Sequence, residues 1–192
     1  MNITKNVARH LARLRYESIP ECSREAAKKS ILDTIGVMTP PSSLDATCQR
    51  LFDLTQEESS GGRSFLVGYG AQSSMQSAAF LNGCSVHALD YDDTLDHIAH
   101  HPSAQTVPEA LAVAQSRGSV SGRDLITAVV AGSDLGARLS SAPNGELGRD
   151  FNWFPITNFG VFSATAAAAH ILKLDEDQMI NALGLLRKKH QS

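Results

Sequence analysis

Apolar residues recur along most of the chain at intervals of three and four, the spacing of one face of an α-helix. Ile3, Val7, Leu11 and Leu14 show this spacing first. The same pattern predicts further helices over residues 21–38, 44–57, 73–88, 159–172 and 175–186, and others that begin at 106 and 121. Most of the chain is therefore expected to be helical.

Polar residues mark where several of these helices begin. Ser18 precedes Glu21 by three residues, which is the spacing of a capping box. Ser121 and Asp175 are predicted N-caps in the same way, the latter with Gln178 at the third helical position. The segment 39–43, TPPSS, is expected to end the helix over 21–38, because proline cannot continue the hydrogen-bond ladder.

Two glycines fall on the apolar face of the helix that begins at 121. Gly132 and Gly136 each cost about 1 kcal/mol of helix propensity relative to alanine. Such glycines allow a second helix to approach closely, so we expect a tight helix–helix contact at this face.

Residues 64–70, SFLVGYG, form the only segment that reads as a strand, and one short strand predicts no sheet. Residues 141–155 read as a loop. No repeat or interdomain linker is visible. The fold class predicted from the pattern is all-α, a multi-helix domain with at most one short strand.

The composition narrows the possible partners and compartments. The 192 residues carry a net charge of −3 and are 42% hydrophobic, which suits a globular domain. The 17 basic residues are scattered, which argues against a nucleic-acid partner. No apolar run approaches the roughly 20 residues of a membrane span. Three cysteines without close pairing favour a reducing compartment, so a cytoplasmic location is expected.

Chemistry-bearing side chains crowd into residues 87–104, HALDYDDTLDHIAHHPSA. This segment holds four of the chain's seven histidines and four aspartates. A zinc-protease helix needs His-Glu-x-x-His, whereas His97 begins HIAHH and Pro102 follows at once. The aspartates lack the regular alternation and the glycine turn of a calcium loop. The spacing therefore predicts no metal site.

Acid–base chemistry requires fewer coincidences in the same segment. Histidine changes charge near neutral pH, and a neighbouring carboxylate can hold its ring in one tautomer. Pro102 restricts the backbone of His101, and Thr94 adds a hydroxyl donor. Such groups can bind a polycarboxylate and move a proton. On spacing alone the alternative stays open, namely that these are solvated loop residues and helix caps.

Three segments resemble the MmgE/PrpD family, namely residues 14–38, 82–139 and 160–186. The pattern D-x-D-D-T…H-P-S from Asp90 to Ser103 carries most of the resemblance. The family's reactions include 2-methylcitrate dehydration, cis-aconitate decarboxylation and iminodisuccinate epimerisation, without a metal or an organic cofactor. The resemblance implies a homodimer, with the active site in a cleft between a large helical domain and a smaller α+β domain. It also implies a small polycarboxylate substrate.

Carried over by motif, three residues are expected to be catalytic. The resemblance implies that His101 transfers a proton or binds a substrate carboxylate, with Asp90 as its electrostatic partner and Thr94 as a hydrogen-bond donor to the substrate. The expected substrate-binding residues are Asp93, His97 and Ser103. We expect the remaining side chains of the segment only to shape and solvate the loop, namely Asp92, Asp96 and His100. The same role is an open alternative for Asp93 and His97.

The chain departs from the family pattern in two ways. Phe154 stands where family members commonly have a histidine, and RKKHQS at 187–192 does not resemble the family's continuation. Residues 1–192 are therefore expected to be part of the helical domain, without the α+β domain, and weak or inactive alone as a lyase. One alternative is an epimerase of an amino- or imino-dicarboxylate. Another is a non-catalytic helical module that pairs with a full-length homologue.

Overall fold

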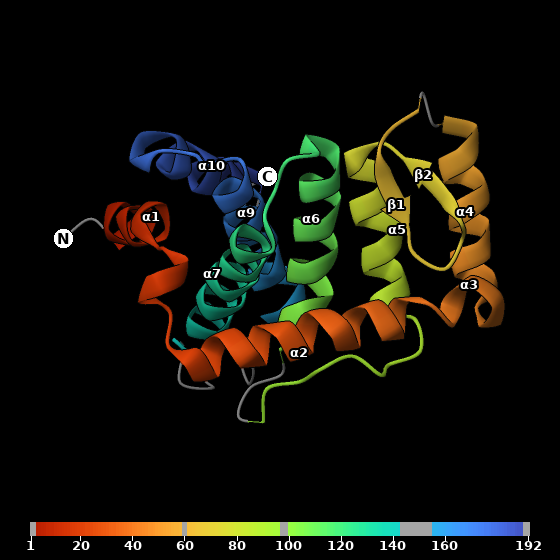
Figure 1. The fold of residues 1–192 in the computed structure, drawn as a ribbon, viewed down its shortest axis with the longest axis horizontal. Coiled ribbons are helices and arrows are strands. Elements are labelled where there is room, and N and C mark those ends of the chain that lie inside the picture. Colours follow the sequence, from red (N-terminus) through yellow and green to blue (C-terminus); the bar gives the residue numbers. More distant parts are fainter. Residues whose placement is uncertain (1–2, 59–60, 97–99, 143–154, 190–192) are drawn as a thin grey trace.

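Helices dominate the computed structural model, which describes residues 3–58, 61–96, 100–142 and 155–189 (Figure 1). The predicted loop over 141–155 lies almost entirely outside these ranges. The elements are α1 (Ile3–Arg13), the 3-10 turn η1 (Tyr16–Ser18), α2 (Glu21–Met38), α3 (Pro41–Leu44), α4 (Ala46–Glu58), β1 (Ser64–Leu66), β2 (Ala71–Ser73), α5 (Met75–His87), α6 (Pro102–Arg117), α7 (Gly122–Ser141), α9 (Pro155–Ile171) and α10 (Glu176–Lys189). The predicted all-α class is confirmed.

The extended segment over 64–70 is the first half of a small β-hairpin. β1 pairs antiparallel with β2, with Ser64 opposite Ser73 and Leu66 opposite Ala71. Gly68 and Gly70 both adopt positive φ in the turn between them. The side chain of Asn82 fastens the hairpin to α5, since its amide donates to Phe65 O and its Oδ1 accepts from Val67 N. β2 has only 3 residues, too few to show a strand period, so it could not be predicted from the sequence.

The capping predictions met different outcomes. The Ser121–Asp124 capping box and the Asp175–Gln178 pair are confirmed as helix starts. The Ser18–Glu21 box is wrong, because Ser18 Oγ accepts from the Arg15 backbone and α2 begins after Pro20. The helix expected from Thr106 starts at Pro102, and Thr106 lies inside it.

Helix α7 packs against α9 and α6, and this contact is as close as the glycines predicted. A Cβ built on Gly132 would lie 2.6 Å from both Ser163 O on α9 and Thr106 Cγ2 on α6. No larger residue fits there without moving a helix. The close helix–helix approach at this face is therefore confirmed.

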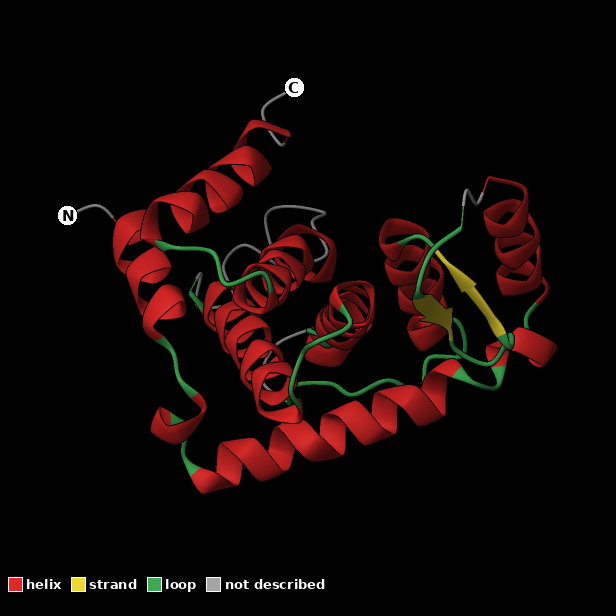
Figure 2. Cartoon of the chain, turned by 45° about the horizontal axis from the view of Figure 1, so that its top comes forward, coloured by secondary structure: helices red, strands yellow, loops and turns green. Residues whose placement is uncertain are grey.

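Two apolar clusters join distant parts of the chain. One brings Ala8 and Leu11 of α1 against α7, α9 and Met179 of α10. The other packs α2, α6, α7 and α9 around Val107 and Ala128. Helix α2 runs along one side of the bundle and contacts α5, α6 and α7 (Figures 1 and 2). Within the ranges that the structure describes, no helix is both long and apolar enough to cross a membrane.

Candidate active site

The histidine- and aspartate-rich segment connects the end of α5 to the start of α6. His87 is the last residue of α5 and His101 is the N-cap of α6. Because α5 packs against α6, the two imidazoles meet, with ring centroids 5.0 Å apart in an edge-to-face arrangement. The loop therefore returns to its own starting point and brings two histidines together.

Asp92 lies between these two rings, and its side chain is only 1% exposed. His87 Nδ1 hydrogen-bonds to both carboxylate oxygens of Asp92, at 3.0 and 3.1 Å. His101 Nδ1 lies 3.0 Å from Oδ2 of the same carboxylate, at the distance of an ion pair but without the angle of a hydrogen bond. The carboxylate in contact with His101 is thus Asp92, whereas the resemblance implied Asp90 as the electrostatic partner of this histidine.

Asp90 and Thr94 lie on the outside of the loop. Asp90 is exposed, and its φ of 57° places it in the left-handed region, which aspartate tolerates better than most residues. Its backbone N–H donates to His87 O and closes a turn at the end of α5. Thr94 is also exposed. Both side chains are accessible to a ligand, and their expected catalytic roles stay predictions.

Two of the expected substrate-binding residues contact each other. The Asp93 carboxylate accepts from Ser103 N at 3.1 Å and from Ser103 Oγ at 2.6 Å. Since Ser103 is in the first turn of α6, Asp93 caps that helix from the preceding loop. His97, the third expected substrate-binding residue, lies outside the described residues. The expected contacts of Asp93 and Ser103 with substrate stay predictions.

The sequence places His100 among the residues that shape and solvate the loop, whereas in the structure its side chain is completely buried. Its ring contacts α7 at Gly136, where a Cβ would come within 2.7 Å of Nε2. Among the described residues, neither ring nitrogen has a hydrogen-bond partner. Burial lowers the pKa of His100, and the adjacent His101 lowers it further. His100 therefore anchors the loop in the core as a neutral side chain.

The side chains of His87, Asp92 and His101 are also the ones that could hold a metal ion. One ligand atom from each lies within 4.8 Å of the others. Two imidazoles and a carboxylate are acceptable ligands for zinc. The same three groups can instead share protons, and this arrangement needs no ion.

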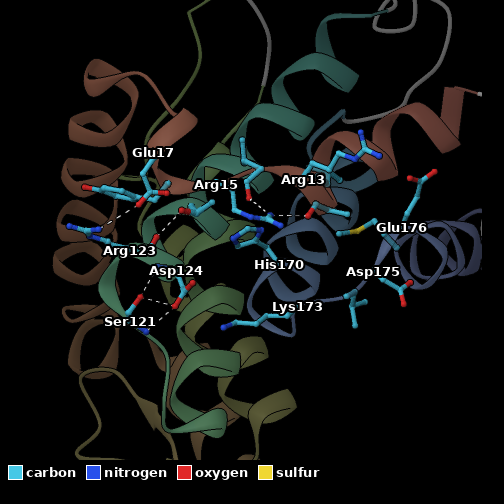
Figure 3. A pocket seen from close by; sticks show the side chains of 17 residues that line it. Arg13, Arg15, Glu17, Ser121, Arg123, Asp124, His170, Lys173, Asp175 and Glu176 are labelled. Atoms are coloured by element: carbon cyan, nitrogen blue, oxygen red, sulfur yellow. Dashed lines mark hydrogen bonds and ion pairs between the residues drawn. The ribbon is translucent and has the colours of Figure 1, made fainter.

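A separate cavity of about 700 Å³ opens between α1, η1, α7, α9 and α10 (Figure 3). None of its lining residues belongs to the loop over 87–104. Its charges largely face partners of their own: Arg123 pairs with Glu17 at 3.5 Å, and Asp124 accepts from Ser121. Burial lowers the pKa of His170, which also lines this cavity. We place the candidate active site at the loop, because the groups that can exchange protons converge there.

Comparisons with known proteins point in one direction. The family model described as the MmgE/PrpD N-terminal domain matches residues 5–192. A cis-aconitate decarboxylase-like protein from Aspergillus oryzae is 30% identical over 96% of this chain and 39% of its own length. Cis-aconitate decarboxylase from Aspergillus terreus is 26% identical over 95% of this chain and 38% of its own length. The human cis-aconitate decarboxylase is 32% identical over 56% of this chain and 23% of its own length. The chain thus spans about two-fifths of the fungal relatives' length.

Proposed function

The chain belongs to the MmgE/PrpD family, as the D-x-D-D-T…H-P-S pattern indicated, and on that premise we propose that the loop over 87–104 forms one wall of a lyase active site. The proposed substrate is a small polycarboxylate, either cis-aconitate, which is decarboxylated, or 2-methylcitrate, which is dehydrated. The proposed chemistry is proton transfer by side chains, without a metal or an organic cofactor.

One observation carries this proposal: the imidazole of His101 lies against a buried carboxylate at the N-terminus of α6. His101 is 14% exposed, so its ring is largely sheltered but still reachable. With Asp92 beside Nδ1, the free nitrogen for chemistry is Nε2. An imidazole with one nitrogen held by a carboxylate is a common arrangement for general acid–base catalysis.

In a decarboxylation, the bond between carbon and the departing carboxylate breaks and carbon dioxide leaves. The electron pair stays on the carbon skeleton until a proton is delivered, and His101 in its imidazolium form would donate that proton. In a dehydration, neutral His101 would instead remove the proton next to a carboxylate, and the hydroxyl group would leave as water after protonation. Thr94 would donate a hydrogen bond to substrate. Asp90 would favour the charged imidazolium through its negative charge alone, beside the direct contact that His101 makes with Asp92.

Ligand binding and product analysis test the proposal together. We expect cis-aconitate or 2-methylcitrate to perturb the NMR signals of Thr94 and His101, and we expect Asp90→Asn and Thr94→Ala to weaken that binding. Carbon dioxide or an alkene as product supports a lyase, whereas an epimerised dicarboxylate supports the isomerase alternative. Binding that neither substitution changes would contradict the proposed site.

A homodimer or pairing with a full-length homologue, and a cytoplasmic location, remain part of the proposal. Size-exclusion chromatography with light scattering, with and without a full-length homologue, tests the first. A monodisperse monomer that does not shift on mixing would contradict it.

A further inference from the structure

We propose that Asp92, supported by His87, is a positioning residue that fixes the ring of His101 with its proton on Nδ1, so that Nε2 is the nitrogen that exchanges protons. This inference rests on the proposed function, because it assigns a role to residues behind the proposed catalytic histidine. It concerns two residues, Asp92 and His87, for which the sequence suggested no catalytic part.

The carboxylate of Asp92 is buried in the folded chain. A carboxylate that is 1% exposed must be compensated by hydrogen bonds or positive charge, since a buried charge without a partner is strongly unfavourable. The groups that face it in the structure are the Nδ1 atoms of His87 and His101. Both imidazoles are therefore needed to satisfy this one carboxylate.

The contacts with Asp92 decide which ring nitrogen of His87 and of His101 carries the proton. A ring nitrogen without a proton presents a lone pair, which is repelled by a carboxylate oxygen 3.0 Å away. A protonated nitrogen at the same distance is attracted, even where the angle is unfavourable. The contact between His101 Nδ1 and Asp92 Oδ2 thus favours the Nδ1–H tautomer, and the hydrogen bonds of His87 favour the same tautomer there.

The backbone holds His101 in place independently of Asp92. Pro102 follows it at the first position of α6 and limits its backbone. Leu95 N donates to His100 O on the preceding residue, and the Asp93–Ser103 pair fixes the first turn of α6. Asp92 therefore acts on an imidazole whose location is already set, and what it adds is the choice of tautomer.

A metal ion in the same place is the competing interpretation. Ligation through Nδ1 would need that nitrogen without a proton on both histidines. Shared protons would instead place a proton on Nδ1 of both rings, toward the oxygens of Asp92. The state of the two Nδ1 atoms therefore distinguishes the two interpretations.

NMR of the full 192-residue chain with ¹⁵N-labelled histidine tests the proposal directly. Two-bond proton–nitrogen correlations identify the tautomer of each neutral ring at a pH of about 8, above the usual titration range of histidine. His87→Gln and His101→Gln each remove one set of signals and so assign them. We expect both rings to carry the proton on Nδ1. His101 with its proton on Nε2 in the unsubstituted chain would overturn the proposal, whether or not any variant folds.

Asp92→Asn separates a positioning role from a merely structural one. The amide can donate to a bare Nδ1, so we expect His101 to change to the Nε2–H form that free histidine prefers. His87→Gln is the matched variant, in which His101 keeps its Nδ1 proton because Asp92 remains. A folded Asp92→Asn chain with an unchanged His101 tautomer would contradict the proposal. Stoichiometric Zn²⁺ that displaces the Nδ1 protons of both rings would also overturn it, in favour of a metal centre.

The test of the tautomer and the test of the proposed function can fail separately. The tautomers are measured without substrate, whereas the lyase proposal is tested by binding and products. Asp90→Asn should weaken polycarboxylate binding and leave the His101 tautomer unchanged. A correct tautomer with no binding would therefore count against the lyase and not against the role of Asp92.

Discussion

The imidazole of His100 lies directly against the backbone of Gly136, and this contact joins helix α7 to the loop that holds the candidate active site. A Cβ on Gly136 would come within 2.7 Å of His100 Nε2 and would also overlap Ser163 Oγ on α9. Since His100 precedes His101 in the chain, this contact links the core of the bundle to the candidate active site.

Gly136→Ala is expected to lower stability and to disturb the loop. The added methyl group must displace a fully buried ring, and overpacking of this kind typically costs about 1–3 kcal/mol. For a chain of this size, each kcal/mol lowers the Tm by about 2–4 °C. Thermal unfolding measures the loss, and NMR shifts at His101 report the movement of the loop.

Gly122→Ala is the matched control in the same helix. No atom lies within 4 Å of a Cβ built on Gly122, and alanine has the higher helix propensity. We expect an unchanged or slightly higher Tm. Equal Tm values for the two variants would show that His100 does not constrain Gly136.

The buried histidines make the stability of the fold depend on pH. Burial lowers the pKa of His100 and of His170 in the folded chain. The unfolded chain therefore binds more protons as the pH falls below about 6.5, and stability is lost on acidification. We expect the free energy of unfolding in urea to fall between about pH 7.5 and pH 5.5.

Single substitutions identify which histidines are responsible. His100→Gln and His170→Gln should each reduce the dependence of stability on pH. His10→Gln on the exposed face of α1 is the matched control. A pH dependence that persists unchanged in both buried-site variants would contradict this explanation.

Glu109 on α6 is expected to show the opposite pH dependence. Burial raises the pKa of Glu109, so ionising its carboxyl group at neutral pH lowers the stability of the fold. This loss is absent below the unfolded-state pKa of about 4.5, where the carboxyl group is protonated in both states. Glu109→Gln should therefore raise the Tm at about pH 7.5 and make little difference at about pH 4. Glu57→Gln on the exposed face of α4 is the control. A lower Tm for Glu109→Gln at neutral pH would refute the prediction.

Asp93 is expected to matter for stability more than its neighbours in the loop. Asp93→Ala leaves the N–H and hydroxyl groups of Ser103 without their acceptor, and Ser103 is only 2% exposed. Loss of such a cap typically costs about 0.5–2 kcal/mol. Urea unfolding should show this loss for Asp93→Ala but not for the exposed Asp96→Ala. Equal stability of the two variants would show that Asp93 does not cap α6.

The sequence alone was sufficient for most of the local structure. Helix period and capping residues identified most of the helices, including the starts of α7 at Ser121 and α10 at Asp175. These signals depend on residues three or four apart, which are read directly from the chain. The glycines of α7 also predicted a close helix contact, though not which helix or loop would fill it.

Only the tertiary structure decided how the candidate site is assembled. Asp90, Asp92 and Asp93 are equivalent by type and nearly so by position, yet one is exposed, one is buried between two imidazoles and one caps α6. Likewise His100 is buried because α7 offers a glycine 36 residues away in sequence. Local pattern specifies what a segment can form, whereas the burial and partners of a loop side chain depend on helices packed against it from elsewhere in the chain.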